Sequence, residues 1–174
     1  RTVGSGKAGA MSDLESAIGK SPPRLEAGEK AGGKALFTGD MVLPGMLHAA
    51  LLTSPYAHAR ILSYDTKAAS ALPGVKAVVT GEDITGVPFG PVVKDEHALA
   101  LGKVRYIGEP VAAVAAEDEE TARLAARLIE VDYEELPAAT TVDAAISDGA
   151  PLLHEEFADY VKVYQAPENA GNVM

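Results

Sequence analysis

The chain has 174 residues, of which 47% are hydrophobic and 23% are charged, so it can bury the core of one domain. It has no cysteine, which excludes disulfides, cysteine-ligated clusters and thiol nucleophiles within this sequence. The net charge of −10 has the wrong sign for binding nucleic acid, and no apolar run approaches the roughly 20 residues of a membrane-spanning helix.

The first 29 residues are rich in glycine, serine, lysine and proline without clear periodicity. We therefore expect residues 1–29 to form a flexible tail and residues 30–174 to form one domain. The first ten residues lack the apolar core of a signal peptide. Together with the absence of cysteine, this favours a reducing compartment, and we expect a cytoplasmic protein.

The first half of the patterned region predicts several strands and one helix. A short helix is expected over residues 65–72, because Asp65 can serve as its N-cap and Pro73–Gly74 ends it. Residues 81–104 lack periodicity and predict a long irregular excursion. The predicted strands here are residues 35–38, 46–53, 60–64 and 75–80.

The strongest local pattern is Pro110–Ala116, a nearly continuous apolar run that is typical of a strand covered on both faces. Asp118 is then expected to cap a helix that runs to about Ile129, with Leu124 and Leu128 widening its apolar stripe. A strand over residues 130–133 and a short helix over 141–146 follow. Strand, helix and strand succeed one another twice, which indicates an α/β or α+β domain.

No complete active site is visible in the sequence, and we predict no catalytic, cofactor-binding or metal-binding residue. The spacing of the four histidines does not require a metal site, although a small metal-dependent enzyme built on histidines and acids is one alternative. Adjacent acids such as Glu134 and Glu135 point to opposite faces of a strand, so they rarely form a catalytic pair. The histidines are His48, His58, His97 and His154.

The turn Ser54–Arg60 is the better candidate, as an interface. It places a proline-constrained turn, two ring side chains and a guanidinium close together, and Arg60 could bind a carboxylate on a neighbouring domain. The alternative is a turn held by internal hydrogen bonds. Glu109 is a further candidate, because it precedes an apolar strand. The candidate interface residues are Ser54, Tyr56, His58, Arg60 and Glu109.

Acidic residues dominate the last third of the chain, where residues 117–160 hold thirteen acids and two bases. Such a surface usually serves solubility. The other interpretation is a docking surface for a basic partner, which would make the chain a free-standing acidic protein-binding or scaffold domain.

Five short runs, together and in this order, resemble one known module. The resemblance is to the N-terminal a/b hammerhead domain of the large molybdenum subunit of the xanthine dehydrogenase and aldehyde oxidase family. That family includes carbon monoxide dehydrogenase and 4-hydroxybenzoyl-CoA reductase, and the resemblance covers residues 18–173. The runs are Leu43–Gly45, Ser54–Arg60, Leu72–Val75, Gly108–Ala112 and Tyr133–Pro137.

This resemblance implies an α+β hammerhead fold, namely a mixed sheet with two crossover helices and a long irregular β excursion. It implies a parent oxidoreductase that uses molybdenum and molybdopterin, with iron–sulfur clusters and FAD on partner subunits or domains. The family's pterin-contacting loops and catalytic glutamate lie downstream of the module. We therefore expect this chain to bind no cofactor, to be inactive alone, and to be a truncated first domain.

The same resemblance implies the partners. These are the remainder of the molybdenum-binding subunit and the iron–sulfur and FAD-binding subunits, without nucleic acid or membrane. The isolated chain could also self-associate, because surfaces meant for a partner would be exposed. The parent substrate stays open among purines, aldehydes, aromatic CoA thioesters and carbon monoxide.

Overall fold

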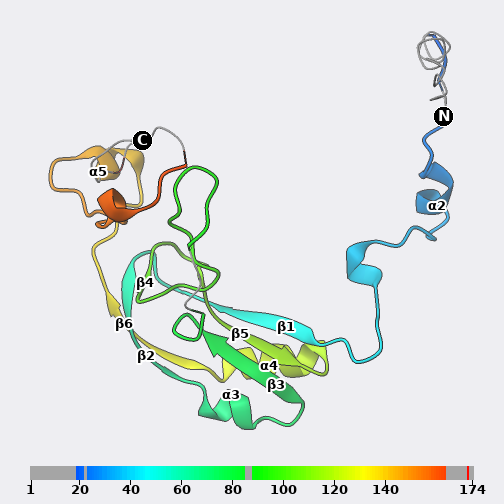
Figure 1. Ribbon diagram of the computed structural model, residues 1–174, viewed down its shortest axis with the longest axis horizontal. Helices are drawn as coiled ribbons and strands as arrows, with labels where there is room; N and C mark the ends of the chain where they lie inside the picture. The colour runs from blue at the N-terminus through cyan, green and yellow to red at the C-terminus, as the bar shows by residue number, and fades with distance from the viewer. Residues whose placement is uncertain (1–18, 22, 85–87, 164–171, 173–174) are drawn as a thin grey trace, which may run out of the picture. The chain divides into compact units, whose positions relative to one another are not determined.

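The structure is a computed structural model that describes residues 19–21, 23–84, 88–163 and 172 (Figure 1). The chain divides into two compact units, residues 1–44 and 45–174. The described part of the first unit contains helix α2 (Ala27–Ala31) and the 3-10 turn η1 (Thr38–Asp40), and none of its described residues is buried.

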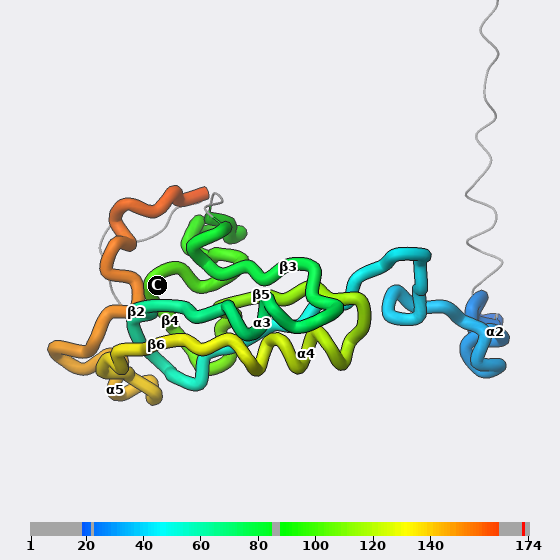
Figure 2. The backbone as a smooth tube through the Cα atoms, turned by 90° about the horizontal axis from the view of Figure 1, so that it is seen from below, coloured from blue at the N-terminus to red at the C-terminus, as the bar shows by residue number. Residues whose placement is uncertain are grey.

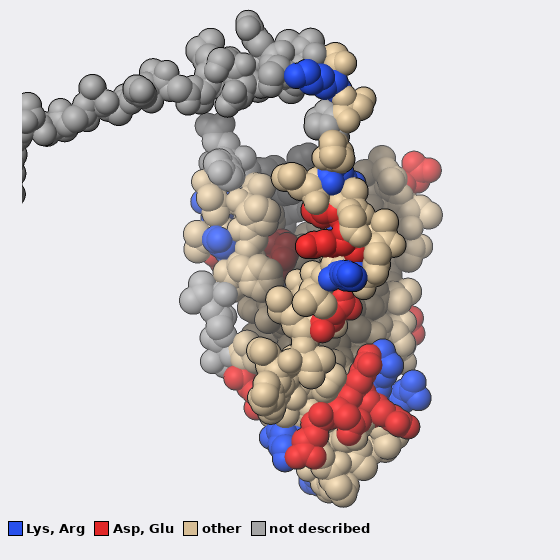
Figure 3. All heavy atoms as spheres, turned by 90° about the vertical axis from the view of Figure 1, so that its right-hand side faces the viewer, with Lys and Arg blue, Asp and Glu red and all other residues tan. Residues whose placement is uncertain are grey.

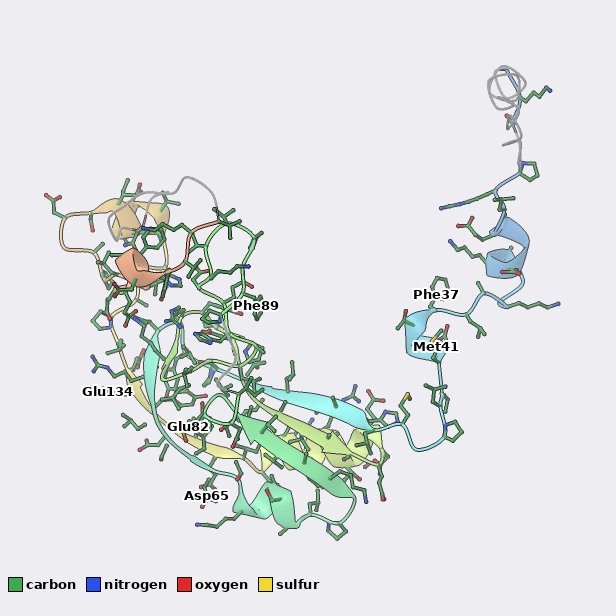
Figure 4. The ribbon with its side chains drawn as sticks, in the orientation of Figure 1. Phe37, Met41, Asp65, Glu82, Phe89 and Glu134 are labelled. Atoms are coloured by element: carbon green, nitrogen blue, oxygen red, sulfur yellow. The ribbon has the colours of Figure 1, made fainter. Side chains whose placement is uncertain are left out.

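The strand predicted over residues 35–38 is wrong. The Phe37 backbone N–H donates a hydrogen bond to Asp40 Oδ2 (2.9 Å), and the Asp40 N–H donates one to the Phe37 carbonyl oxygen (2.9 Å). These two bonds close a turn where the sequence pattern indicated extended pairing. The Phe37 and Met41 side chains lie exposed on this turn (Figure 4).

The described part of the second unit forms two three-stranded sheets, in the orders β1-β5-β3 and β4-β2-β6, and every strand pair in them is antiparallel. The α+β class is therefore right, whereas the single mixed sheet of the prediction is instead two separate antiparallel sheets. The strands are β1 (His48–Thr53), β2 (Ala59–Asp65), β3 (Val75–Thr80), β4 (Lys103–Val104), β5 (Pro110–Ala116) and β6 (Glu130–Glu135).

The predicted strand–helix–strand units exist, but each one leads from one sheet to the other. Helix α3 (Lys67–Ala71) follows β2 and precedes β3, and helix α4 (Glu119–Arg127) follows β5 and precedes β6. Each helix thus connects strands that are not neighbours in one sheet, so no parallel pair arises. This is the physical reason for the difference from the expected mixed sheet.

One hydrophobic core lies between the β1-β5-β3 sheet and the two helices. Helix α4 packs mainly on β1 and β5, and α3 packs on β3, on the same face of the sheet (Figure 2). Leu124 and Leu128 do not widen the buried stripe as predicted, because they are 47% and 37% exposed and neither packs against this core. The buried residues of this core are Ala69, Ala112, Val114, Ala125, Ala126 and Ile129.

A second core joins the two sheets near the excursion. Its fully or almost fully buried members are Ala59, Ala100, Val104 and Val111, against which the rings of three tyrosines pack. The described residues of the excursion are irregular, as predicted, apart from β4 and isolated bridges. One bridge, between Val93 and Lys162, ties the excursion to the chain beyond the 3-10 turn η2 (Phe157–Asp159).

Helix ends follow the capping chemistry of the sequence. Asp118 caps α4 by accepting a hydrogen bond from the Thr121 N–H (2.8 Å), and Thr141 caps α5 (Val142–Ile146) through the Ala144 N–H (3.2 Å). At α3 the N-cap is Thr66, although the Asp65 carboxylate still accepts the Lys67 N–H (3.0 Å). None of the described helices has the length and apolar character needed to span a bilayer.

Candidate functional site

The turn between β1 and β2 is anchored to the residues that precede β5. The Ser54 N–H donates to the Glu109 carbonyl oxygen (2.9 Å), and the Gly108 N–H donates to the Ser54 carbonyl oxygen (2.8 Å). The buried Ser54 hydroxyl accepts a hydrogen bond from the Tyr56 N–H (3.0 Å). Internal hydrogen bonds thus hold this turn. This is the arrangement expected under the alternative interpretation, in which the turn has no interface role.

Two ring side chains of the same turn point into the protein. His58 is 4% exposed, and its Nδ1 donates to the Pro137 carbonyl oxygen (2.7 Å), because a carbonyl oxygen can only accept. Its Nε2 is buried and has no hydrogen-bond partner among the described residues. The Tyr56 ring lies 5.2 Å from the Tyr133 ring, within the second core. These residues therefore shape the interior, and their role at an interface stays a prediction.

Arg60 is the exposed member of the predicted set. Its Nη1 lies 2.9 Å from Glu134 Oε2 on the neighbouring strand β6, where Figure 4 labels Glu134. Both side chains are at least half exposed. The guanidinium thus has a carboxylate partner within its own chain, and the predicted contact with a neighbouring domain remains untested.

Glu109 lines a cavity that the sequence did not indicate, and Arg60 is not among the lining residues. Glu109 Oε2 accepts a hydrogen bond from the Arg105 backbone N–H, which closes the loop before β5. The cavity has a volume of about 450 Å³. It is lined by Asp95, Glu96, His97, Arg105, Tyr106, Glu109, Leu153 and His154.

A neighbouring cavity of about 320 Å³ shares Asp95, Leu153 and His154 with the first. His154 Nε2 lies 3.9 Å from Asp95 Oδ2, and its Nδ1 lies 3.3 Å from the Tyr160 hydroxyl. No local spacing in the sequence connects these residues, because the excursion and the chain beyond β6 meet only in the folded structure. Sequence reasoning therefore missed this cluster.

Burial is the main cause of the pKa shifts of His154 and Tyr160 in this cluster. It lowers the pKa of His154 below its ordinary value, and the positive charge of Arg105 acts in the same direction. Burial also raises the pKa of Tyr160. Lys103, whose side chain is 12% exposed, reaches Glu155 at 3.6 Å. The cluster thus joins the excursion to the later segment through one ion pair, Lys103–Glu155, and through the polar contacts of His154.

The described residues that line the larger of these two cavities do not fit a molybdopterin cofactor. Among the described residues, no three His, Cys, Asp or Glu side chains converge to hold a metal ion. The larger cavity carries three carboxylates, Asp95, Glu96 and Glu109, against the single guanidinium of Arg105. A phosphate-bearing pterin is anionic, and the excess of negative charge opposes its binding there.

Two of the acidic side chains near the start of α4 have basic partners. Figure 3 shows a group of acidic atoms in the lower part of the view, with basic atoms beside it. Glu117 pairs with Lys76 (2.7 Å), and Glu119 pairs with Arg123 one helical turn later. These pairs reduce the charge that the surface offers to a basic partner.

Comparison with known proteins places this geometry in a family. Residues 32–137 match the family model for "Aldehyde oxidase and xanthine dehydrogenase, a/b hammerhead domain". A probable xanthine dehydrogenase subunit from Bacillus subtilis is 42% identical over 128 residues, which is 73% of this chain and 17% of that protein. The xanthine dehydrogenase molybdenum-binding subunit of Escherichia coli O157:H7 is 39% identical over 142 residues, or 75% of this chain and 19% of the relative.

A solved structure supports the same family assignment. The CO dehydrogenase from Oligotropha carboxidovorans superposes with a TM-score of 0.75 at 39% identity, over 81% of this chain and 18% of that one. The chain thus spans less than a fifth of the length of these relatives. The resemblance found in the sequence motifs is confirmed, and the chain belongs to the aldehyde oxidase and xanthine dehydrogenase family, of which it contains the a/b hammerhead domain.

Proposed function

We propose that this chain serves as a structural and subunit-interface domain in the large subunit of a molybdopterin-dependent oxidoreductase. In this role it frames the molybdenum site and contributes no catalytic residue of its own. The observation that carries the proposal is the match of residues 32–137 to a domain whose relatives include a molybdenum-binding subunit, of which this chain spans 19%.

The polar residues of the candidate site support this role, because they are engaged in holding the fold. Ser54 and His58 form hydrogen bonds inside the chain, and Arg60 pairs with Glu134. The acid-rich cavity beside Glu109 opposes an anionic cofactor. In this role the cofactor is held by the remainder of the molybdenum-binding subunit, and iron–sulfur and FAD-binding subunits are the expected further partners.

The proposal is tested with two proteins made in a host that synthesises molybdopterin. One is this chain alone, and the other is a chimera in which this chain replaces the homologous region of the E. coli molybdenum-binding subunit. We expect the chimera to contain molybdenum and to reduce an electron-accepting dye, and the chain alone to do neither. A metal-loaded or active chain alone, or a chimera without molybdenum, would contradict the proposal.

A further inference from the structure

The β1-β5-β3 sheet has one face on which none of the described helices packs. Side chains alternate between the two faces of a strand, and the helix-facing set is the one packed in the first core. The strand register places the other set in two cross-strand rows. These rows, which we term the helix-free face, are Ala49–Ala115–Ala77 and Leu51–Ala113–Val79.

All six side chains of the helix-free face are aliphatic, although the face is open. Leu51 is 54% exposed, Ala49 and Ala77 are exposed, and the other three are half-buried. None of the six belongs to either hydrophobic core. An antiparallel sheet that faces water usually alternates apolar and polar residues. The apolar run of β5, which predicted a strand covered on both faces, is therefore covered by helices on one face only.

The rows are also shaped for close contact. Four of the six side chains are alanine, so a helix or sheet can approach the strands without meeting bulky groups, while Leu51 and Val79 supply larger apolar contacts. Charged residues follow the rows closely in the sequence, since Lys76 precedes Ala77 and pairs with Glu117 (2.7 Å) just beyond the end of β5. An apolar centre with a polar margin is the usual anatomy of a stable protein interface.

We propose that the helix-free face is the surface on which the remainder of a molybdenum-binding subunit packs, through an aliphatic layer of that polypeptide. The inference rests on the proposed function. In the relatives, more than four-fifths of the polypeptide lies outside the region that this chain matches, which makes that polypeptide the expected occupant of the face. An uncharged face gives no basis for recognising a nucleic acid or a charged peptide.

The test uses the absence of native cysteine, since each single-cysteine variant then has one thiol in this chain. Leu51→Cys probes the helix-free face. Leu124→Cys is the matched control, because Leu124 is similarly exposed (47% against 54%) but lies on the outer side of α4. Iodoacetamide modification of each thiol is timed by mass spectrometry of its peptide, in the chain alone and in the chimera described above.

In the dilute chain alone, both thiols should react at similar rates. In a chimera that contains molybdenum, the thiol at position 51 should react at least tenfold more slowly, and that at position 124 at an unchanged rate. Equal reactivity of the two positions in such a chimera would overturn the proposal about the face and leave the proposed function standing. Protection of position 51 in the chain alone that grows with protein concentration would assign the face to a second copy, and would overturn it too. A chimera without molybdenum contradicts the proposed function and this inference together.

Discussion

Arg60 on β2 and Glu134 on β6 are directly opposite each other in the antiparallel register, with Nη1 and Oε2 2.9 Å apart. The pair lies on the exposed side of the sheet, where water screens the attraction. Opposite charges in such cross-strand positions contribute roughly 0.2–1 kcal/mol to stability. The pair therefore favours the β2–β6 register without being a major source of stability.

Arg60→Ala should lower the free energy of unfolding by no more than about 1 kcal/mol, because only a screened ion pair is lost. Urea unfolding of Arg60→Ala, Glu134→Ala and the double variant measures the coupling between the two side chains. If Arg60 also serves an interface, Arg60→Ala in the chimera should weaken the association between the chimera and its partner subunits, while the domain stays folded. Unchanged association would exclude that role.

The sequence predicts local features of this fold better than long-range ones. Strand β5 and the Asp118 cap depend on residues adjacent in the chain, and both are found as expected. The separation into two sheets depends on which strands pair across long loops, which local patterns do not encode. The proximity of Asp95 and His154 arises in the same way, from packing of two irregular segments.

Gly81→Ala should be strongly destabilising. A Cβ atom at this position would lie 2.0 Å from the Ala100 carbonyl oxygen and 2.9 Å from its carbon. The Ala100 backbone cannot yield easily, since its N–H is bonded to the Pro110 carbonyl oxygen (2.7 Å). We expect a loss of about 1–3 kcal/mol or more, measured by thermal unfolding.

Gly39→Ala is the control for that substitution, because a Cβ atom at Gly39 would have nothing within 4 Å of it. The melting temperature of Gly39→Ala should match that of the unsubstituted chain. Similar melting temperatures for both variants would mean that the excursion does not pack tightly against the end of β3.

His58 should tolerate only a side chain that keeps its hydrogen bond. His58→Ala removes the donor to the Pro137 carbonyl oxygen and leaves a space in the interior, which should cost about 1–3 kcal/mol. His58→Asn keeps an N–H donor near the position of Nδ1 and should cost less. Urea unfolding of the two variants provides the comparison, and equal losses would show that packing, and not the hydrogen bond, is what matters at this position.

Asp118→Ala should lower the melting temperature by a few degrees, because the carboxylate accepts hydrogen bonds from the Thr121 N–H and hydroxyl (both 2.8 Å) at the start of α4. The same bonds lower the pKa of Asp118. Its contribution to stability is therefore present above the ordinary aspartate pKa and is lost as the pH falls through the lowered value. Asp118→Ser keeps a capping oxygen and should melt close to the unsubstituted chain at neutral pH.

His154 should make the stability of the second unit depend on mildly acidic pH. Burial, with Arg105, lowers the pKa of His154, so the unfolded chain takes up this proton at a higher pH than the folded chain. Stability from this residue is thus complete above the ordinary histidine pKa of about 6.5, and falls as the pH drops from there towards the lowered value.

His154→Phe keeps a ring against Tyr160, whose ring centre is 5.8 Å away, but cannot titrate. The difference in melting temperature between pH 7 and pH 5 should be smaller for His154→Phe than for the unsubstituted chain, whereas His48→Gln, on β1, should retain the full difference because it leaves His154 in place. An unchanged difference in His154→Phe would show that the protonated imidazole is accommodated in the cluster with Asp95.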